Sequence, residues 1–195
     1  MRKTVVMASL VVASTSMMAM DLEYYLGAGA QRVSLNAESS SDENTTYKDS
    51  VKDTALLLKG GVILEKAHRI SLSYSIISEE NADITTILAN YDYLFPMNDQ
   101  FKLYAGFHAG NTKVDVSSFD YIDGFSYSGF AYGIQSGAIY DITKNIQFEA
   151  GLSYTKFNVT KEESRGIDNN GTNYTLSGVE LKDAISMFAG LNYKF

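Results

Sequence analysis

The sequence contains no cysteine and no tryptophan, and proline occurs once in 195 residues. The absence of cysteine excludes a disulfide scaffold, a thiolate metal site, a cysteine nucleophile and a lipid-modified amino terminus. Basic residues number 16 against 23 acidic ones, and a net charge of −7 gives no reason to expect nucleic acid binding. The chain is rich in tyrosine and phenylalanine, at 14 and 10 residues, and this composition suits long strands better than helices.

The amino terminus has the order of a secretory signal peptide. Arg2 and Lys3 precede an apolar stretch from Val5 to Ala13, and small polar residues and Ala19 follow it. Cleavage after Ala19 is the expected site, with a cut after Ser16 as the alternative. The apolar stretch is shorter than the roughly 20 residues that a membrane-spanning helix needs. The sequence therefore predicts a signal peptide over residues 1–19 and a single mature domain over residues 20–195.

Apolar and polar residues alternate with a period of two along most of the chain, and this pattern predicts strands with one apolar face. The alternation is clearest from Ile185 to Phe195. It recurs over residues 22–34, 54–64, 69–76, 89–95, 101–110, 132–140 and 146–155. Tyrosines lie near the strand ends, where the aromatic girdles of a membrane barrel are expected. A mature chain of this length divides well into eight strands and their connections.

The connections between these strands alternate in length. Short links lie at residues 65–68, 96–100 and 141–144, and long polar segments at 36–53, 116–128 and 161–178, with a shorter link at 79–83. Transmembrane barrels show the same asymmetry, with short periplasmic turns and longer outer loops. We therefore predict an all-β protein, an eight-stranded antiparallel up-and-down transmembrane β-barrel.

The face opposite the apolar one carries charged residues and many glycines. Its charged positions are Glu23, Lys59, Arg69, Asp92, Lys102, Glu149 and Lys182. A dry soluble core tolerates few such charges, whereas an ion-paired lumen with lipid outside accommodates them. Because the interior of an eight-stranded barrel is just wide enough for side chains, we predict a lumen ion-pair network that obstructs passage. The alternative is a narrow polar conduit, helped by lumen-facing glycines such as Gly137 and Gly151.

The last five residues, Leu191-Asn192-Tyr193-Lys194-Phe195, end in phenylalanine with an aromatic residue two positions earlier. This ending resembles the carboxyl-terminal signal of outer-membrane β-barrel proteins. Together with the export signal and the eight alternating strands, it makes the chain similar to small barrels of the OmpA/OmpX or opacity-protein type. The resemblance implies that the barrel-assembly machinery reads Leu191, Tyr193 and Phe195. It also implies a place in the bacterial outer membrane, surrounded by its lipid and lipopolysaccharide.

Catalytic groups are scarce, since the chain has only two histidines. His68 falls in a short link, where we expect a solvated side chain, and His108 faces the lumen. The outer-membrane lipid A deacylases carry a His-x-Ser-Asn motif. Here Gly110 stands where the nucleophilic serine would be, so that activity is not supported, and we predict no catalytic residue.

Two polar segments, residues 38–46 and 167–175, are rich in acids and amides. Neither has the spacing of a defined calcium loop, so we predict no metal or cofactor. Asn44 and Asn170 each lie in an Asn-x-Thr sequence with an acid two positions upstream, which resembles the acceptor of some bacterial glycosylation systems.

Three functions follow from the sequence, in order of preference. The first is a non-enzymatic outer-membrane barrel with a structural role, whose long loops bind an extracellular macromolecule in the manner of an adhesin. The second is a narrow channel for small solutes. The third is an enzyme that modifies outer-membrane lipid, which the sequence does not support because it shows no nucleophile and base suited to that chemistry.

Overall fold

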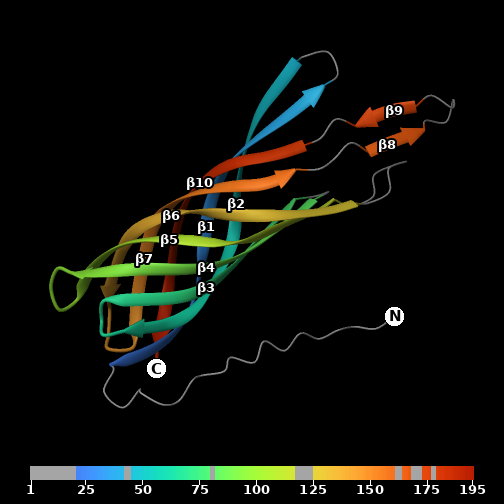
Figure 1. Ribbon diagram of the computed structural model, residues 1–195. Helices are drawn as coiled ribbons and strands as arrows, with labels where there is room; N and C mark the ends of the chain where they lie inside the picture. Colours follow the sequence, from blue (N-terminus) through green and yellow to red (C-terminus); the bar gives the residue numbers. More distant parts are fainter. Residues whose placement is uncertain are drawn as a thin grey trace, which may run out of the picture.

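The computed structural model describes residues 21–41, 45–79, 82–116, 125–160, 164–167, 173–176 and 179–195. Eight antiparallel strands close into a barrel with the order β1-β10-β7-β6-β5-β4-β3-β2, in agreement with the predicted fold (Figure 1). The barrel strands are β1 (Leu22–Ser41), β2 (Thr45–Leu64), β3 (His68–Glu79), β4 (Ala82–Pro96), β5 (Phe101–Val116), β6 (Phe125–Asp141), β7 (Ile146–Thr160) and β10 (Val179–Lys194). None of the described residues forms a helix long and apolar enough to cross a membrane. The predicted signal peptide, Asn44 and Asn170 lie outside the described residues.

Short turns join the strands at one end of the barrel, which we call the turn end. The β2–β3 turn contains Glu65 and Lys66 with positive φ angles of 49° and 59°. In the β4–β5 turn, Asn98 Oδ1 accepts hydrogen bonds from the backbone N–H groups of Gln100 and Phe101. Thr143 Oγ1 has the same role in the β6–β7 turn. These side chains replace backbone partners and so allow tight connections.

At the opposite end, the loop end, the strands are longer than the sequence pattern predicts. β1 continues to Ser41 and β2 begins at Thr45, so the predicted loop over residues 36–53 is mostly strand. Within the predicted loop 161–178, β8 (Ser164–Ile167) and β9 (Asn173–Leu176) pair as a hairpin. These loop predictions were wrong because apolar and polar residues alternate only where one face of a strand lies in an apolar environment. A strand that extends beyond the lipid keeps its backbone hydrogen bonds without that pattern.

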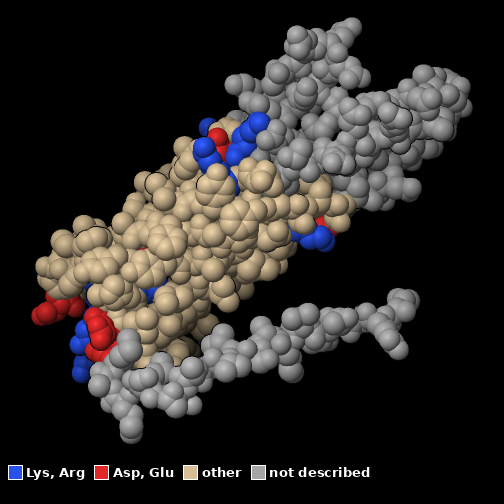
Figure 2. Space-filling view, in the orientation of Figure 1, with Lys and Arg blue, Asp and Glu red and all other residues tan. Residues whose placement is uncertain are grey.

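The alternating residues lie on opposite faces of the barrel wall, as predicted. Leu152 and Met187 are 52% and 61% exposed on the outer face, whereas Glu149 is 3% exposed inside. On the face shown in Figure 2 the wall is almost free of charged side chains between its two ends. Exposed tyrosines, Tyr24, Tyr93, Tyr140 and Tyr193, lie near the turn end. An apolar outer band with an aromatic rim is suited to lipid.

His68 does not lie in a turn, contrary to the sequence prediction. It is the first residue of β3 and is half-buried on the outer face among aromatic side chains. Its Nδ1 lies 2.8 Å from the hydroxyl of Tyr91, and its ring contacts Tyr93 edge-on. The strand begins earlier than its apolar pattern because His68 pairs with Leu64 and Tyr93 in the neighbouring strands.

A closed barrel of this kind is expected to resist unfolding by detergent at room temperature, because it has no free edge strand from which to open. Unheated protein should therefore migrate differently from boiled protein on a detergent gel. Circular dichroism of the unheated sample should show strand and no helix. Equal migration together with a helical spectrum would contradict the fold.

Candidate functional site in the barrel lumen

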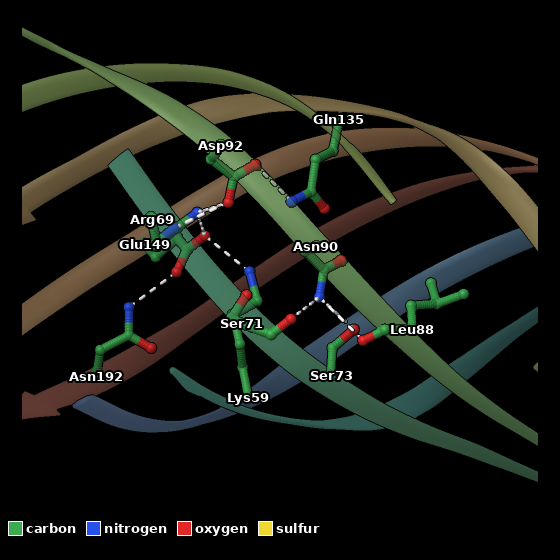
Figure 3. Close-up of polar contacts among 10 residues, drawn as sticks. All are labelled: Lys59, Arg69, Ser71, Ser73, Leu88, Asn90, Asp92, Gln135, Glu149 and Asn192. Carbon is green, nitrogen blue, oxygen red and sulfur yellow. Dashed lines mark hydrogen bonds and ion pairs between the residues drawn. The ribbon is translucent and has the colours of Figure 1, made fainter. Parts of the chain in front are cut away.

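Four charged side chains from four strands meet inside the barrel, toward the turn end (Figure 3). They are Lys59 of β2, Arg69 of β3, Asp92 of β4 and Glu149 of β7. Glu149 Oε1 accepts hydrogen bonds from Lys59 Nζ and Arg69 Nη2, both at 2.9 Å. Arg69 also donates from Nε to Asp92 Oδ2 at 2.9 Å. The four groups form one connected chain across the lumen, which we call the ion-pair cluster.

Two amides complete the ion-pair cluster. Gln135 Nε2 of β6 donates to Asp92 Oδ1 at 2.6 Å, and Asn192 Nδ2 of β10 donates to Glu149 Oε2 at 2.8 Å. Both carboxylates are therefore bound through both of their oxygens. The alternation places Gln135 and Asn192 on the inner face, but a search for charges alone overlooks them.

The ion-pair cluster is buried and electrically balanced. The relative exposures of Arg69, Asp92, Glu149 and Lys59 are 1%, 0%, 3% and 7%. Two cations stand against two carboxylates, so every charge has a partner. Burying an ion is costly, and only close pairing with further hydrogen bonds offsets that cost. Removal of any one of the four charged side chains would therefore leave a buried charge without its full set of partners.

Aromatic side chains fill the space around the cluster. The Arg69 guanidinium lies 4.5 Å from the ring centre of Tyr104, and Lys59 Nζ lies 4.9 Å from that of Phe188. Both rings belong to a buried apolar cluster formed by Tyr25, Ile63, Leu94, Tyr104, Ile139 and Phe188. The inner face is therefore not as polar as the sequence pattern indicated. Side chains occupy this part of the lumen.

Three lumen-facing glycines make room for large side chains from other strands. A Cβ atom added to Gly137 or Gly151 would lie 2.6 Å or 2.5 Å from the hydroxyl oxygen of Tyr104. One added to Gly133 would lie 2.7 Å from His108 Nε2. Such distances are shorter than van der Waals contact. At these positions the glycines therefore accommodate side chains from other strands, and they do not leave an open conduit.

The other predicted charges, Lys102, Glu23 and Lys182, lie outside the ion-pair cluster. Near the turn end, Lys102 pairs with Asp141, and Lys194 Nζ lies 3.2 Å from Glu23 Oε2 and 3.7 Å from Asp141 Oδ1. Asp141 and Lys194 had not been predicted as members, because Asp141 was assigned to a turn. Lys182 is half-buried near the loop end of β10, away from both groups. The predicted set is thus divided among three levels of the barrel.

On the loop side of the ion-pair cluster lies a cavity of about 60 Å³ with a mixed polar and apolar lining. Its lining includes Ser73, Asn90, His108 and Thr155. His108 Nε2 is 3.0 Å from Thr155 Oγ1, and its Nδ1 has no hydrogen-bond partner among the described residues. Such a volume holds a few waters. Gly110, on the same strand, offers no nucleophile to this histidine.

Toward the loop end, inward-facing apolar residues form a second buried cluster, of which Val33, Ile77 and Ala184 also line the cavity. Its members are Val33, Leu35, Ala55, Ile77 and Ala184, with Ile84 and Phe157 packed against them. Among the described residues, no group of histidine, aspartate and glutamate is arranged to hold a metal ion. The described interior thus consists of two polar clusters, an aromatic filling, a small cavity and an apolar layer.

Comparison with known proteins agrees with this architecture. The model of the outer membrane protein beta-barrel domain matches residues 5–195. The chain belongs to this outer membrane β-barrel family. The family is located in the bacterial outer membrane, where short turns face the periplasm and the opposite end faces outward. The loop end of this outer-membrane barrel is therefore its external end.

Several solved structures share the fold at low sequence identity. Neisserial surface protein A matches with a TM-score of 0.60 and 19% identity, covering 88% of this chain and 97% of that one. Outer membrane protein H of Pseudomonas aeruginosa matches with a TM-score of 0.52 and 23% identity, covering 85% and 99%. Ail of Yersinia pestis, in complex with the heparin analogue sucrose octasulfate, gives 0.55 and 17%, covering 90% and 99%. No curated protein sequence matches this outer-membrane barrel.

Proposed function

We propose that this protein is a non-enzymatic, non-conducting outer-membrane barrel that anchors a surface-exposed end in the membrane. The observation that carries the proposal is the ion-pair cluster, which joins six of the eight strands across the lumen. Aromatic side chains fill the space beside it. An interior occupied in this way favours a structural role over transport of solutes.

The external end supports an adhesin-like role within this proposal. β1 and β2 continue well past their outward-facing apolar residues, so they project beyond the lipid (Figure 1). Ail, which shares the fold, has been solved with a heparin analogue bound. We propose that the loop end of this chain likewise meets an extracellular macromolecule.

The proposal includes the route to the membrane. Residues 1–19 would direct export, and the assembly machinery would read Leu191, Tyr193 and Phe195. These three side chains are 53%, 51% and 69% exposed on the outer face at the end of the last strand. They are therefore accessible to a partner that binds the strand before the barrel closes.

Conductance tests the closed lumen directly. Purified protein inserted into planar lipid bilayers is expected to give little steady current, because the ion-pair cluster and its aromatic neighbours block the path. Insertion should be checked independently by protease protection in the same lipid. Large, steady currents from folded protein would reject the closed lumen. They would favour the narrow channel, for which the cavity in the lumen is the supporting feature.

A further inference from the structure

His108 lies on the inner face of β5, next to the ion-pair cluster on its loop side. The side chain is 2% exposed, and it lines the lumen cavity together with Lys59 and Gln135 of the cluster. His108 pairs with Gly133 of β6, where a Cβ atom would lie 2.7 Å from its Nε2, so the glycine leaves space for the ring. The strand register and this glycine therefore hold a titratable group beside the buried charges.

Only one of the two ring nitrogens of His108 has a hydrogen-bond partner. Nε2 lies 3.0 Å from Thr155 Oγ1, whereas Nδ1 is buried and has no partner among the described residues. A neutral imidazole carries one N–H, and the Thr155 hydroxyl can donate or accept, so this arrangement suits the neutral ring. In the protonated ring both nitrogens are donors. The added Nδ1–H would then be left without an acceptor among the described residues.

The ion-pair cluster has no carboxylate to spare for a charged His108. Both oxygens of Asp92 already accept hydrogen bonds, one from Arg69 and one from Gln135 (Figure 3). On β6 and β10 the described side chains that line the cavity are uncharged. Among the described residues, the charged side chains that face His108 all belong to the ion-pair cluster: Lys59 of β2, Arg69 of β3, Asp92 of β4 and Glu149 of β7. A proton on His108 would therefore add a third buried cation to two carboxylates.

We propose that His108 is an acid sensor that loosens the closed lumen when its ring takes up a proton. This inference rests on the closed lumen of the proposed function. In the loosened state, water reaches Nδ1 and separates the new cation from Lys59. The adjoining cavity is large enough to hold the first of these waters. Because the proton binds the loosened state more tightly than the closed one, acid shifts the equilibrium toward the loosened state.

The conductance of the full barrel in planar lipid bilayers, compared at about pH 7.5 and about pH 5, tests the proposal, because an ordinary histidine titrates between these values. The fraction of time spent conducting is expected to rise in acid. The rise can reach about 30-fold, the limit for one histidine that binds its proton with ordinary affinity in the loosened state only. His108→Gln keeps a polar group beside Thr155 but cannot take up a proton, so it should abolish the rise.

His68→Gln is the matched control, because it removes the only other histidine, which lies on the outer face of β3. It should keep the rise in full. Heat-dependent migration on gels shows whether each variant is folded, and His108→Asn replaces His108→Gln if the glutamine variant does not fold. A rise in the unmodified protein and in His68→Gln that is absent from the His108 variant supports the acid sensor.

The acid sensor and the closed lumen fail in different ways. Little current from the unmodified protein at both pH values would overturn the acid sensor and leave the lumen closed. A rise that persists without His108, or one that disappears in His68→Gln, would also overturn it. Large currents at neutral pH would reject the closed lumen. In that case a further rise in acid that depends on His108 would still support the sensor, and currents that do not change with pH would reject it.

Discussion

Replacing Glu149 with alanine is expected to lower the free energy of unfolding by about 3 to 5 kcal/mol, the cost of leaving a buried charge without its partner. Glu149 accepts hydrogen bonds from Lys59, Arg69 and Asn192. After its removal, one carboxylate, Asp92, remains for two buried cations. Reversible urea unfolding from lipid vesicles, followed by tyrosine fluorescence, measures the change.

Glu23→Ala is the matched control for this substitution. Glu23 also pairs with a lysine, but its side chain is 32% exposed, so water compensates for the lost partner. Its loss should cost about 1 kcal/mol or less. Equal effects of the two substitutions would show that the ion-pair cluster has no special importance for stability.

The Glu149→Ala variant should also conduct more ions than the unmodified protein. Removing the carboxylate releases Lys59 and Arg69 from their common partner and opens polar space across the lumen. Glu149→Gln, which keeps the shape of the side chain, separates loss of charge from loss of volume. A conductance that is already high and does not change with either variant would contradict a closed lumen.

Replacing Leu152 with arginine is expected to destabilise the barrel by about 2 to 4 kcal/mol, the cost of placing a charge in the lipid near the middle of the bilayer. Leu152 is 52% exposed on the outer face of β7, within its apolar stretch from Ile146 to Tyr154. The same unfolding measurement in vesicles gives the difference from the unmodified protein.

Asn158→Arg is the matched control on the same strand. Asn158 also faces outward, but it lies beyond Lys156, where the apolar band has ended, so the expected cost is about 0 to 1 kcal/mol. Ser153→Arg avoids the lipid, yet its side chain would have to fit the small lumen cavity that Ser153 lines. If Asn158→Arg costs more than Leu152→Arg, the assigned depth of the band is wrong.

Much of the fold could be predicted because each membrane-spanning strand contacts lipid on one face and the barrel interior on the other. Lipid requires an apolar side chain at every second position, and the interior does not, so the alternation around Leu152 or Met187 marks both the strand and its orientation. Beyond the lipid this requirement ends. The predicted loop from Asn36 to Asp53 was wrong for that reason, because hydrogen bonding between backbones continues whatever the side chains are.

The sequence by itself determined the class of protein, the eight strands of the barrel and the inward orientation of Lys59, Arg69, Asp92 and Glu149. These features follow from the two-residue alternation within each strand. Only the tertiary structure decided which charges meet. Arg69 and Glu149 are far apart in the chain and on non-adjacent strands, and they touch because the pairing register brings them to one level of a narrow lumen. Lys102 and Glu23 have the same inward orientation but lie at another level, where Asp141 and Lys194 are their partners. The face to which a side chain points is a local property of its strand. Its position along the barrel axis depends on the register of every intervening strand pair and on the space left by residues such as Gly137.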